Sequence, residues 1–264
     1  MIDIQALVHD LNVVREKSPL IHNITNYVVM NNTANGLLAI GASPVMAHAI
    51  DEVADMAGIA SALVINIGTL DAQWVESMLV AGRTALAKNT PVILDPVGSG
   101  ATPYRTKVCK QIIDECKPSI IRGNASEIMA LCNANVQTKG VDSTDSSDIA
   151  LDSAKLLAQQ TGAVVIVSGQ TDYITNGTDV KTVKNGNPMM ARVTGMGCTA
   201  TAIVAVFAAV NQNLLDAATH GMAVMGIAGE IAAGKSYGNG SLQMNFLDEL
   251  YNMDEEVIKN NIKQ

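Results

Sequence analysis

The chain of 264 residues has few charged residues (16%) and very few aromatic residues (3%). Its charges are also unbalanced: 17 lysines and arginines stand against 25 aspartates and glutamates, which gives a net charge of −8. This balance argues against nucleic acid or an acidic membrane surface as the main partner, because both attract basic surfaces. A local basic pocket for a phosphorylated ligand remains compatible with the composition.

Cysteine is scarce as well, with four in the chain: Cys109, Cys116, Cys132 and Cys198. No two of them have C-x-x-C spacing and no histidine pair lies near them, so no zinc site is predicted. The first residues contain no basic segment followed by an apolar one, which is the pattern of a secretory signal. We therefore expect free thiols in a reducing cytoplasm.

Long apolar runs are absent too. Residues 18–50 carry no charge, but they contain five asparagines, two prolines and two glycines. Residues 193–215 are also uncharged, and their purely apolar run covers only 202–210. A membrane-spanning helix needs about 20 apolar residues, so no membrane partner is expected. Both stretches are predicted to be buried, in part through self-association.

Short apolar, β-branched runs alternate with stretches of helical pattern through the first part of the chain. The expected strands cover residues 62–66, 91–95, 119–122 and 164–168, and the expected helices cover 51–60, 71–88, 104–116, 125–132 and 147–161. Nearly continuous apolar strands are typical of a parallel sheet buried on both faces. We predict an α/β fold: one domain over 1–264, with a doubly wound, mostly parallel central sheet and helices on both faces.

The pattern changes after residue 168. Residues 172–176 and 180–184 flank a Gly-Thr pair and predict an antiparallel hairpin. Helices are then expected over 198–211, 214–234 and 241–263. The polar residues 136–147 are expected to form a solvent-exposed loop.

Small, polar and charged residues stand at the end of each of the four expected parallel strands or directly after it; among them are Gly68, Asp95, Arg122, Asn124, Glu127 and Ser168. The carboxyl ends of the strands form the ligand-binding edge of an open parallel sheet. Ordinary strand-to-helix turns would explain any one of these segments. Four of them together favour a site at this edge.

The segment 193–200, Val-Thr-Gly-Met-Gly-Cys-Thr-Ala, precedes a long uncharged helix. Gly195 and Gly197 let backbone N–H groups approach a ligand, and a helix N-terminus adds unpaired donors and about half a positive charge. These features predict an anion hole for a phosphoryl group. Cys198 would lie in the first turn, where the pKa of a thiol falls. A glycine-rich turn with a small buried cysteine explains the same residues equally well.

This segment resembles the glycine-rich anion-hole motif of the ribokinase-like superfamily, whose last position is usually aspartate. A cysteine there is characteristic of hydroxyethylthiazole kinases. The likeness runs from about residue 18 to about residue 240. Further segments agree with it: 124–127 is similar to the superfamily's N-x-x-E element, 95–98 to its other acidic turn, and 21–28 and 41–46 to the family's thiazole-binding segments.

The resemblance implies a ribokinase-like fold without a separate lid. It implies ATP-dependent phosphorylation of the hydroxyl of 4-methyl-5-(2-hydroxyethyl)thiazole in thiamine biosynthesis or salvage, with Mg²⁺, by a homotrimer whose active sites lie between subunits. It also implies residue roles: Met46, Asn26 and Gly195 for the thiazole substrate, Arg122 and Ser168 for ATP, Asp95 and Glu127 for the metal, and Cys198, Gly195 and Gly197 at the reacting groups.

The residues suit this chemistry in their own right. Phosphoryl transfer depends on positioning and on charge neutralisation. Arg122 offers a planar donor fork for phosphate, although a surface ion pair is its simpler alternative. The carboxylates of Asp95 and Glu127 offer the hard oxygens that Mg²⁺ prefers. Met46 suits an apolar pocket for a small sulfur-containing ring, and equally suits core packing.

Residues 229–236 match the P-loop pattern G-x-x-x-x-G-K-[ST]. A true P-loop follows a strand and opens a helix, whereas this stretch continues a helical pattern and is followed by a turn. We therefore predict that Gly234 and Lys235 end a helix.

Two further interpretations stay open. A ribokinase-like fold could act on another small alcohol or carry an ATP- or ADP-dependent hydro-lyase, because a fold does not define a reaction. A non-catalytic nucleotide-binding module is the third possibility, and the intact set of acidic, basic and glycine residues argues against it.

Overall fold

The computed structural model describes residues 1–132 and 145–264. Most of the exposed loop expected over 136–147 therefore lies outside the described residues. The described chain forms one eight-stranded sheet with the order β2-β1-β3-β4-β5-β6-β7-β8. Its strands are β1 (Leu20–Ile24), β2 (Ser43–Val45), β3 (Ala62–Asn66), β4 (Val92–Asp95), β5 (Ile120–Asn124), β6 (Val164–Ser168), β7 (Asp172–Thr175) and β8 (Val180–Val183).

The strand directions confirm a mostly parallel sheet. Every pairing from β2 through β1, β3, β4 and β5 to β6 is parallel. The pairings of β7 with β6 and with β8 are antiparallel, so the expected hairpin closes one edge of the sheet. The carboxyl ends of the six parallel strands consequently share one edge.

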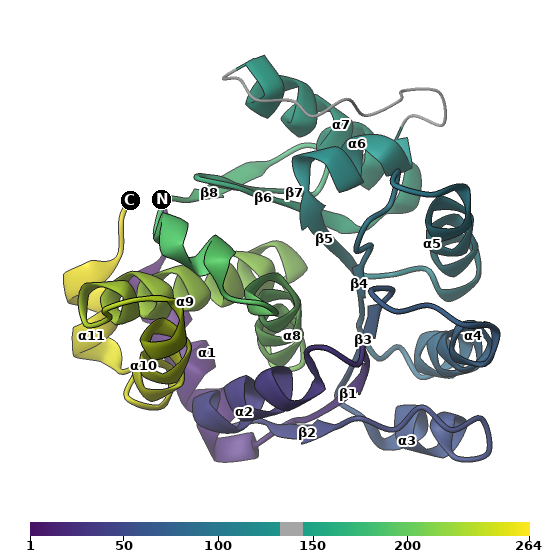
Figure 1. The fold of residues 1–264 in the computed structure, drawn as a ribbon, viewed down its shortest axis with the longest axis horizontal. Coiled ribbons are helices and arrows are strands. Elements are labelled where there is room, and N and C mark those ends of the chain that lie inside the picture. Colours follow the sequence, from purple (N-terminus) through teal and green to yellow (C-terminus); the bar gives the residue numbers. More distant parts are fainter. Residues whose placement is uncertain (133–144) are drawn as a thin grey trace.

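Helices cover both faces of the sheet (Figure 1). One face carries α3 (Val53–Ile59), α4 (Ala72–Ala87), α5 (Pro103–Cys116), α6 (Ala125–Cys132) and α7 (Asp145–Thr161). The other carries α1 (Ile4–Lys17), α2 (Met30–Ile40), α8 (Met196–Ala208), α9 (Leu214–Gly234), α10 (Asn239–Tyr251) and α11 (Glu255–Asn261). This two-sided arrangement confirms the doubly wound α/β fold.

The sheet separates two apolar cores. Successive strand side chains point to opposite faces, so Val64 and Ile93 join the core beneath α8, while Leu63 and Leu94 join the core beneath α4 and α5. Helix α8 packs on β1, β3 and β4, and most of its length is buried. This burial explains why its sequence carries no charge, and it fixes the helix N-terminus at the carboxyl edge of the sheet.

Some elements were absent from the sequence-based prediction. Strands β1 and β2 and helices α1 and α2 build the N-terminal part of the fold, and a 3₁₀ helix covers Pro188–Arg192. The single helix expected over 241–263 is wrong, because it is divided into α10 and α11. Asp254 caps α11 by accepting a hydrogen bond from the amide of Val257 at 2.8 Å, which begins a new helix there.

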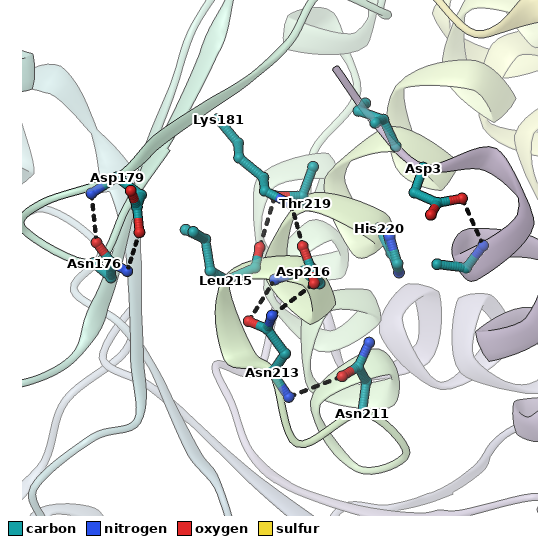
Figure 2. A network of polar contacts seen from close by, with 12 residues as sticks. Asp3, Asn176, Asp179, Lys181, Asn211, Asn213, Leu215, Asp216, Thr219 and His220 are labelled. Atoms are coloured by element: carbon teal, nitrogen blue, oxygen red, sulfur yellow. Dashed lines mark hydrogen bonds and ion pairs between the residues drawn. The ribbon is translucent and has the colours of Figure 1, made fainter.

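Figure 2 shows how the start of α9 is anchored. Asn213 is the N-cap and accepts a hydrogen bond from the amide of Asp216 at 3.3 Å. Lys181 of β8 pairs with the Asp216 carboxylate, which joins the sheet edge to the helix.

The other end of α9 contains the P-loop-like sequence. The helix ends at Gly234, and Lys235 pairs with Glu249 of α10 at 2.7 Å. No strand precedes this segment and no helix opens at it, so the helix-end prediction is confirmed. None of the helices in the described part of the chain is both long and apolar enough to cross a membrane.

Candidate active site

A cavity of about 800 Å³ opens at the carboxyl edge of the sheet, beside the N-terminus of α8. Seven of the residues singled out from the sequence line it: Asp95, Arg122, Glu127, Ser168, Gly195, Gly197 and Cys198. They come from β4, β5, α6, β6 and the first turn of α8. The topology therefore brings together the turns that the sequence pattern placed at one edge.

Gly195 is the N-cap of α8 and has a φ of +89°, in the left-handed region that favours glycine. The first amides of a helix have no intrahelical acceptor. The Met196 amide donates to the carbonyl of Val193 at 3.4 Å, so the amides of Gly197 and Cys198 are the ones available to a ligand. Gly197 follows within the first turn. The predicted glycine-rich helix start is therefore present at the wall of the cavity.

Arg122 reaches the same cavity from β5. Its Nη2 donates to the hydroxyl of Ser168 at 2.7 Å, and the Ser168 hydroxyl donates to the carbonyl of Gly123 at 3.2 Å. Among the described residues Arg122 forms no ion pair. A half-buried guanidinium that keeps donors free suits an anionic ligand. Within the described part of the chain, the surface ion pair considered from the sequence is therefore not formed.

Asp95 ends β4 and is almost fully buried. Its Oδ2 accepts hydrogen bonds from Asn66 Nδ2 at 2.8 Å and from the Thr201 hydroxyl at 2.9 Å. Burial raises the pKa of the Asp95 carboxyl to about 6, and the neighbouring Arg122 acts in the opposite direction. At neutral pH Asp95 is therefore ionised and has its Oδ1 available, without a hydrogen bond from the described residues.

Glu127 lies in the first turn of α6. Its Oε1 accepts from the amide of Gly98 and its Oε2 from the amide of Asn124, both at 2.8 Å. The two bonds tie the turn after β4 to the end of β5, so both carboxylate oxygens are already engaged. This explains the N-x-x-E pattern physically: the side chain three residues after Asn124 reaches back to the helix start.

These two carboxylates fit a magnesium ion that is shared with a ligand. Within residues 1–132 and 145–264, no three His, Cys, Asp or Glu side chains form a metal-binding group. Mg²⁺ is usually held by one or two carboxylates together with phosphate oxygens and several waters. Asp95 has one oxygen without a hydrogen bond from the described residues, and each oxygen of Glu127 accepts one, so both side chains keep acceptor capacity for such an ion.

The expectation of a lowered thiol pKa at Cys198 is wrong. Burial, with the Asp95 carboxylate acting in the same direction, raises the pKa of this thiol to about 11. Its sulfur accepts a hydrogen bond from Asn26 Nδ2 at 3.5 Å. Loss of solvent is the main cause, and with this pKa Cys198 is a neutral thiol at physiological pH.

Of the three residues assigned to the thiazole, Gly195 lines the cavity, whereas Asn26 and Met46 are not among the residues that line it. Asn26 follows β1 and reaches the site through Cys198. Met46 directly follows β2 at the outer edge of the sheet, and its side chain is partly exposed. The core packing considered for Met46 is therefore incomplete in the single chain.

Asn66 was not recognised from the sequence. It is buried at the end of β3, and its Oδ1 accepts from Asn26 Nδ2 and from the Gly68 amide, both at 2.9 Å. Its Nδ2 donates to Asp95. Asn66 therefore connects the Asn26 side of the site to the Asp95 side. Its place at a strand end, like that of Asp95, is the signal that could have identified it.

Another part of the cavity wall, formed by residues of the 3₁₀ helix and of α9, is largely apolar. It is lined by three methionines, Met190, Met222 and Met225, together with Pro188. Met190 approaches α9 at Gly229, where a Cβ would come within 2.3 Å of its sulfur. The cavity thus combines a polar end suited to phosphates with a methionine-lined end suited to a flat ring.

The fold defines the class of protein. The chain superposes on a ribokinase-like superfamily protein from Enterococcus faecalis V583 with a TM-score of 0.61 and 13% identity, covering 89% of this chain and 87% of that one. At this identity the match shows the fold, which is ribokinase-like.

Closer relatives show the family. The model of the hydroxyethylthiazole kinase family matches residues 11–256. A hydroxyethylthiazole kinase of Leptospira biflexa is 54% identical over 252 residues, which are 96% of this chain and 94% of that protein. The structure of the hydroxyethylthiazole kinase protein from Pyrococcus horikoshii OT3 superposes with a TM-score of 0.91 at 40% identity, covering 98% of both chains. The chain belongs to the hydroxyethylthiazole kinase family.

Proposed function

We propose that this chain is a kinase that transfers the terminal phosphoryl group of ATP to the hydroxyl of 4-methyl-5-(2-hydroxyethyl)thiazole, in thiamine biosynthesis or salvage. The observation that carries the proposal is the meeting of the Arg122 guanidinium, the Asp95 carboxylate and the α8 N-terminus at one end of a single cavity. Membership of the family supports the choice of the thiazole alcohol over another small alcohol or a hydro-lyase.

The polar end of the cavity would bind the phosphates. Arg122, held by Ser168, presents a positive charge, and the amides after Gly195 present donors to the transferred group. Donors that are in place before the reaction stabilise the charge that develops in phosphoryl transfer. Asn26 and Cys198 lie where they would orient the attacking hydroxyl.

Asp95 and Glu127 would hold Mg²⁺, Asp95 directly and Glu127 through water. When bound, this ion neutralises charge on the phosphate oxygens of ATP. The hydrogen bonds from Asn66 and Thr201 keep the Asp95 carboxylate oriented with one oxygen available.

We further propose that the active protein is a homotrimer with active sites between subunits. Met46 and Asn26 lie outside the cavity of the single chain. Large side chains directly after Asn26 are exposed, with Tyr27 59% and Val28 63% exposed. A second subunit at this edge would cover these side chains and complete a thiazole pocket. Light scattering of the purified protein tests the trimer.

The proposal also includes a single catalytic domain and a cytoplasmic location. The eight strands form one sheet, which supports a single catalytic domain over 1–264 without a separate lid. All four cysteines are free, which suits a cytoplasmic enzyme.

The decisive experiment measures ADP released from ATP with Mg²⁺, with and without the thiazole alcohol. We expect release that depends on the alcohol, and a strong fall of kcat in Asp95→Asn and Glu127→Gln with the fold retained. Release that is indifferent to the alcohol, or activation by a different small alcohol only, would reject the proposal.

A further inference from the structure

From β4 to β8, each strand contributes at least one polar side chain to the carboxyl edge of the sheet, in spatial order. They are Asp95 at the end of β4, Arg122 on β5, Ser168 at the end of β6, Asp172 at the start of β7 and Asn185 shortly after β8. All five line the same cavity. The polar end therefore leads, strand by strand, to the methionine-lined end, and Asp172 lies between the two.

Asp172 has an unusual environment for a carboxylate. It is only 7% exposed, and its Oδ1 accepts a hydrogen bond from the Gly169 amide at 3.0 Å. It forms no other hydrogen bond and no ion pair among the described residues. Burial raises the pKa of Asp172 to about 6, against the effects of the Gly169 amide and Arg122. The second carboxylate oxygen is not fully buried, so a donor on a ligand in the cavity can reach it.

We propose that Asp172 accepts hydrogen bonds from the ribose hydroxyl groups of the bound nucleotide through its unused carboxylate oxygen and so determines the preference for ribonucleotides. This inference rests on the proposed use of ATP and adds a specificity-determining residue to it.

The chemistry of the neighbours excludes the other parts of the nucleotide. Phosphates are drawn to Arg122 and the α8 N-terminus and are repelled by the Asp172 carboxylate. Asp172 is also remote from Asp95: β7 lies three strands from β4, which is about 14 Å at the usual strand spacing. A flat base suits the methionines beyond it. The hydroxyl groups between triphosphate and base are the donors that a carboxylate accepts best.

The test compares the binding of ATP, 2′-deoxy-ATP and 3′-deoxy-ATP by titration calorimetry with Mg²⁺. The wild-type chain, Asp172→Asn and Asp172→Ala are measured. The Asp172→Asn variant keeps an acceptor for the Gly169 amide. Its nucleotide affinities therefore test the proposal even if the Asp172→Ala variant is unstable. Asp179→Asn is the matched control, because Asp179 is an exposed carboxylate at the turn of the same hairpin and does not line the cavity.

We expect the wild-type and Asp179→Asn chains to bind ATP about tenfold more tightly than at least one deoxynucleotide, as the loss of a charged hydrogen bond predicts. In Asp172→Ala this ratio should fall to near one, mainly through weaker binding of ATP. Equal affinities in the wild type, or an unchanged ratio in both Asp172 variants, would overturn the inference. Thiazole-dependent ADP release by the same preparations tests the proposed function separately. If only the role of Asp172 is wrong, this ADP release is still observed.

Discussion

The guanidinium of Arg122 lies directly against Gly197 in the first turn of α8, and a Cβ at position 197 would come within 2.9 Å of Nη1. The missing side chain therefore leaves room for the cation as well as for a ligand. Strand β5 and helix α8 are distant in sequence, yet this contact brings the positive charge of Arg122 on β5 next to the N-terminal amides of α8.

Substitution of Gly197 should disturb nucleotide binding more than folding. In Gly197→Ala the added carbon meets the end of a flexible side chain, so Arg122 can move away from its place beside Ser168. We expect KM for ATP to rise about tenfold, as loss of one charge-assisted contact predicts, with KM for the thiazole alcohol little changed. Gly197→Val should be nearly inactive. A normal KM for ATP in both variants would contradict this.

Gly195→Ala should behave differently, because the strain lies in the backbone. With φ at +89° and Val29 Cγ1 only 3.0 Å from the added carbon, the alanine is disfavoured in the folded state. We expect a loss of about 1–2 kcal/mol in the free energy of unfolding together with lower kcat. Urea denaturation beside steady-state kinetics measures both; full stability with full activity would exclude this role for Gly195.

Cys198 should assist without acting as a thiolate. With a pKa of about 11, almost none of it ionises near neutral pH. A thiolate base with an ordinary pKa of about 8–9 would make the rate rise with pH in the wild type and not in Cys198→Ala. We therefore expect the pH–rate profile to show no such difference between the two proteins. We expect Cys198→Ala to keep measurable activity and Cys198→Asp to be active, because a carboxylate is also an acceptor at a helix N-terminus. Complete loss of activity in a well-folded Cys198→Ala would instead indicate an essential thiolate.

Asn66 and Thr201 donate to the same oxygen of Asp95, so variants of these two residues can be compared directly. Thr201→Val removes one donor, whereas Asn66→Ala also removes the acceptor for Asn26 and Gly68. Both variants should lower kcat, and only Asn66→Ala should also raise KM for the thiazole alcohol. Buried groups left unpaired cost about 1–3 kcal/mol each, so Asn66→Ala should also melt earlier. Identical KM values in the two variants would separate Asn66 from the thiazole pocket.

Asp172→Asn should stabilise the protein in a pH-dependent way. The pKa of Asp172 is raised from 3.8 to about 6. The folded state therefore binds the proton more tightly, and this contribution to stability is present below pH 4 and lost as the pH rises through 6. Asparagine does not titrate. The variant should gain about 1–3 kcal/mol at pH 7.5 and nothing near pH 4, measured by denaturation at both pH values. An equal gain in the free energy of unfolding at pH 4 and at pH 7.5 would show that the burial of a charge is not its cause.

The sequence alone determined those parts of the molecule that local patterns encode. Apolar runs of four or five residues located β3, β4, β5 and β6, because a strand buried on both faces needs no polar alternation. Small and acidic residues after those runs marked the edge at which Arg122, Glu127 and Gly197 meet. The glycines at the start of an uncharged helix indicated that the N-terminus of α8 lies at this edge.

Tertiary structure decided the rest, because the remaining properties arise between segments that are distant in the chain. Strand β1 carries the polar residues His22 and Asn23, so its own pattern did not indicate a buried strand. This segment becomes a strand because it pairs with β2 and β3. The pKa of Cys198 is high because Asp95 and the packing of the site surround it, which no helix position by itself reveals. The joining of Asn26 to Asp95 through Asn66 likewise exists only where β1, β3 and β4 lie side by side in the sheet.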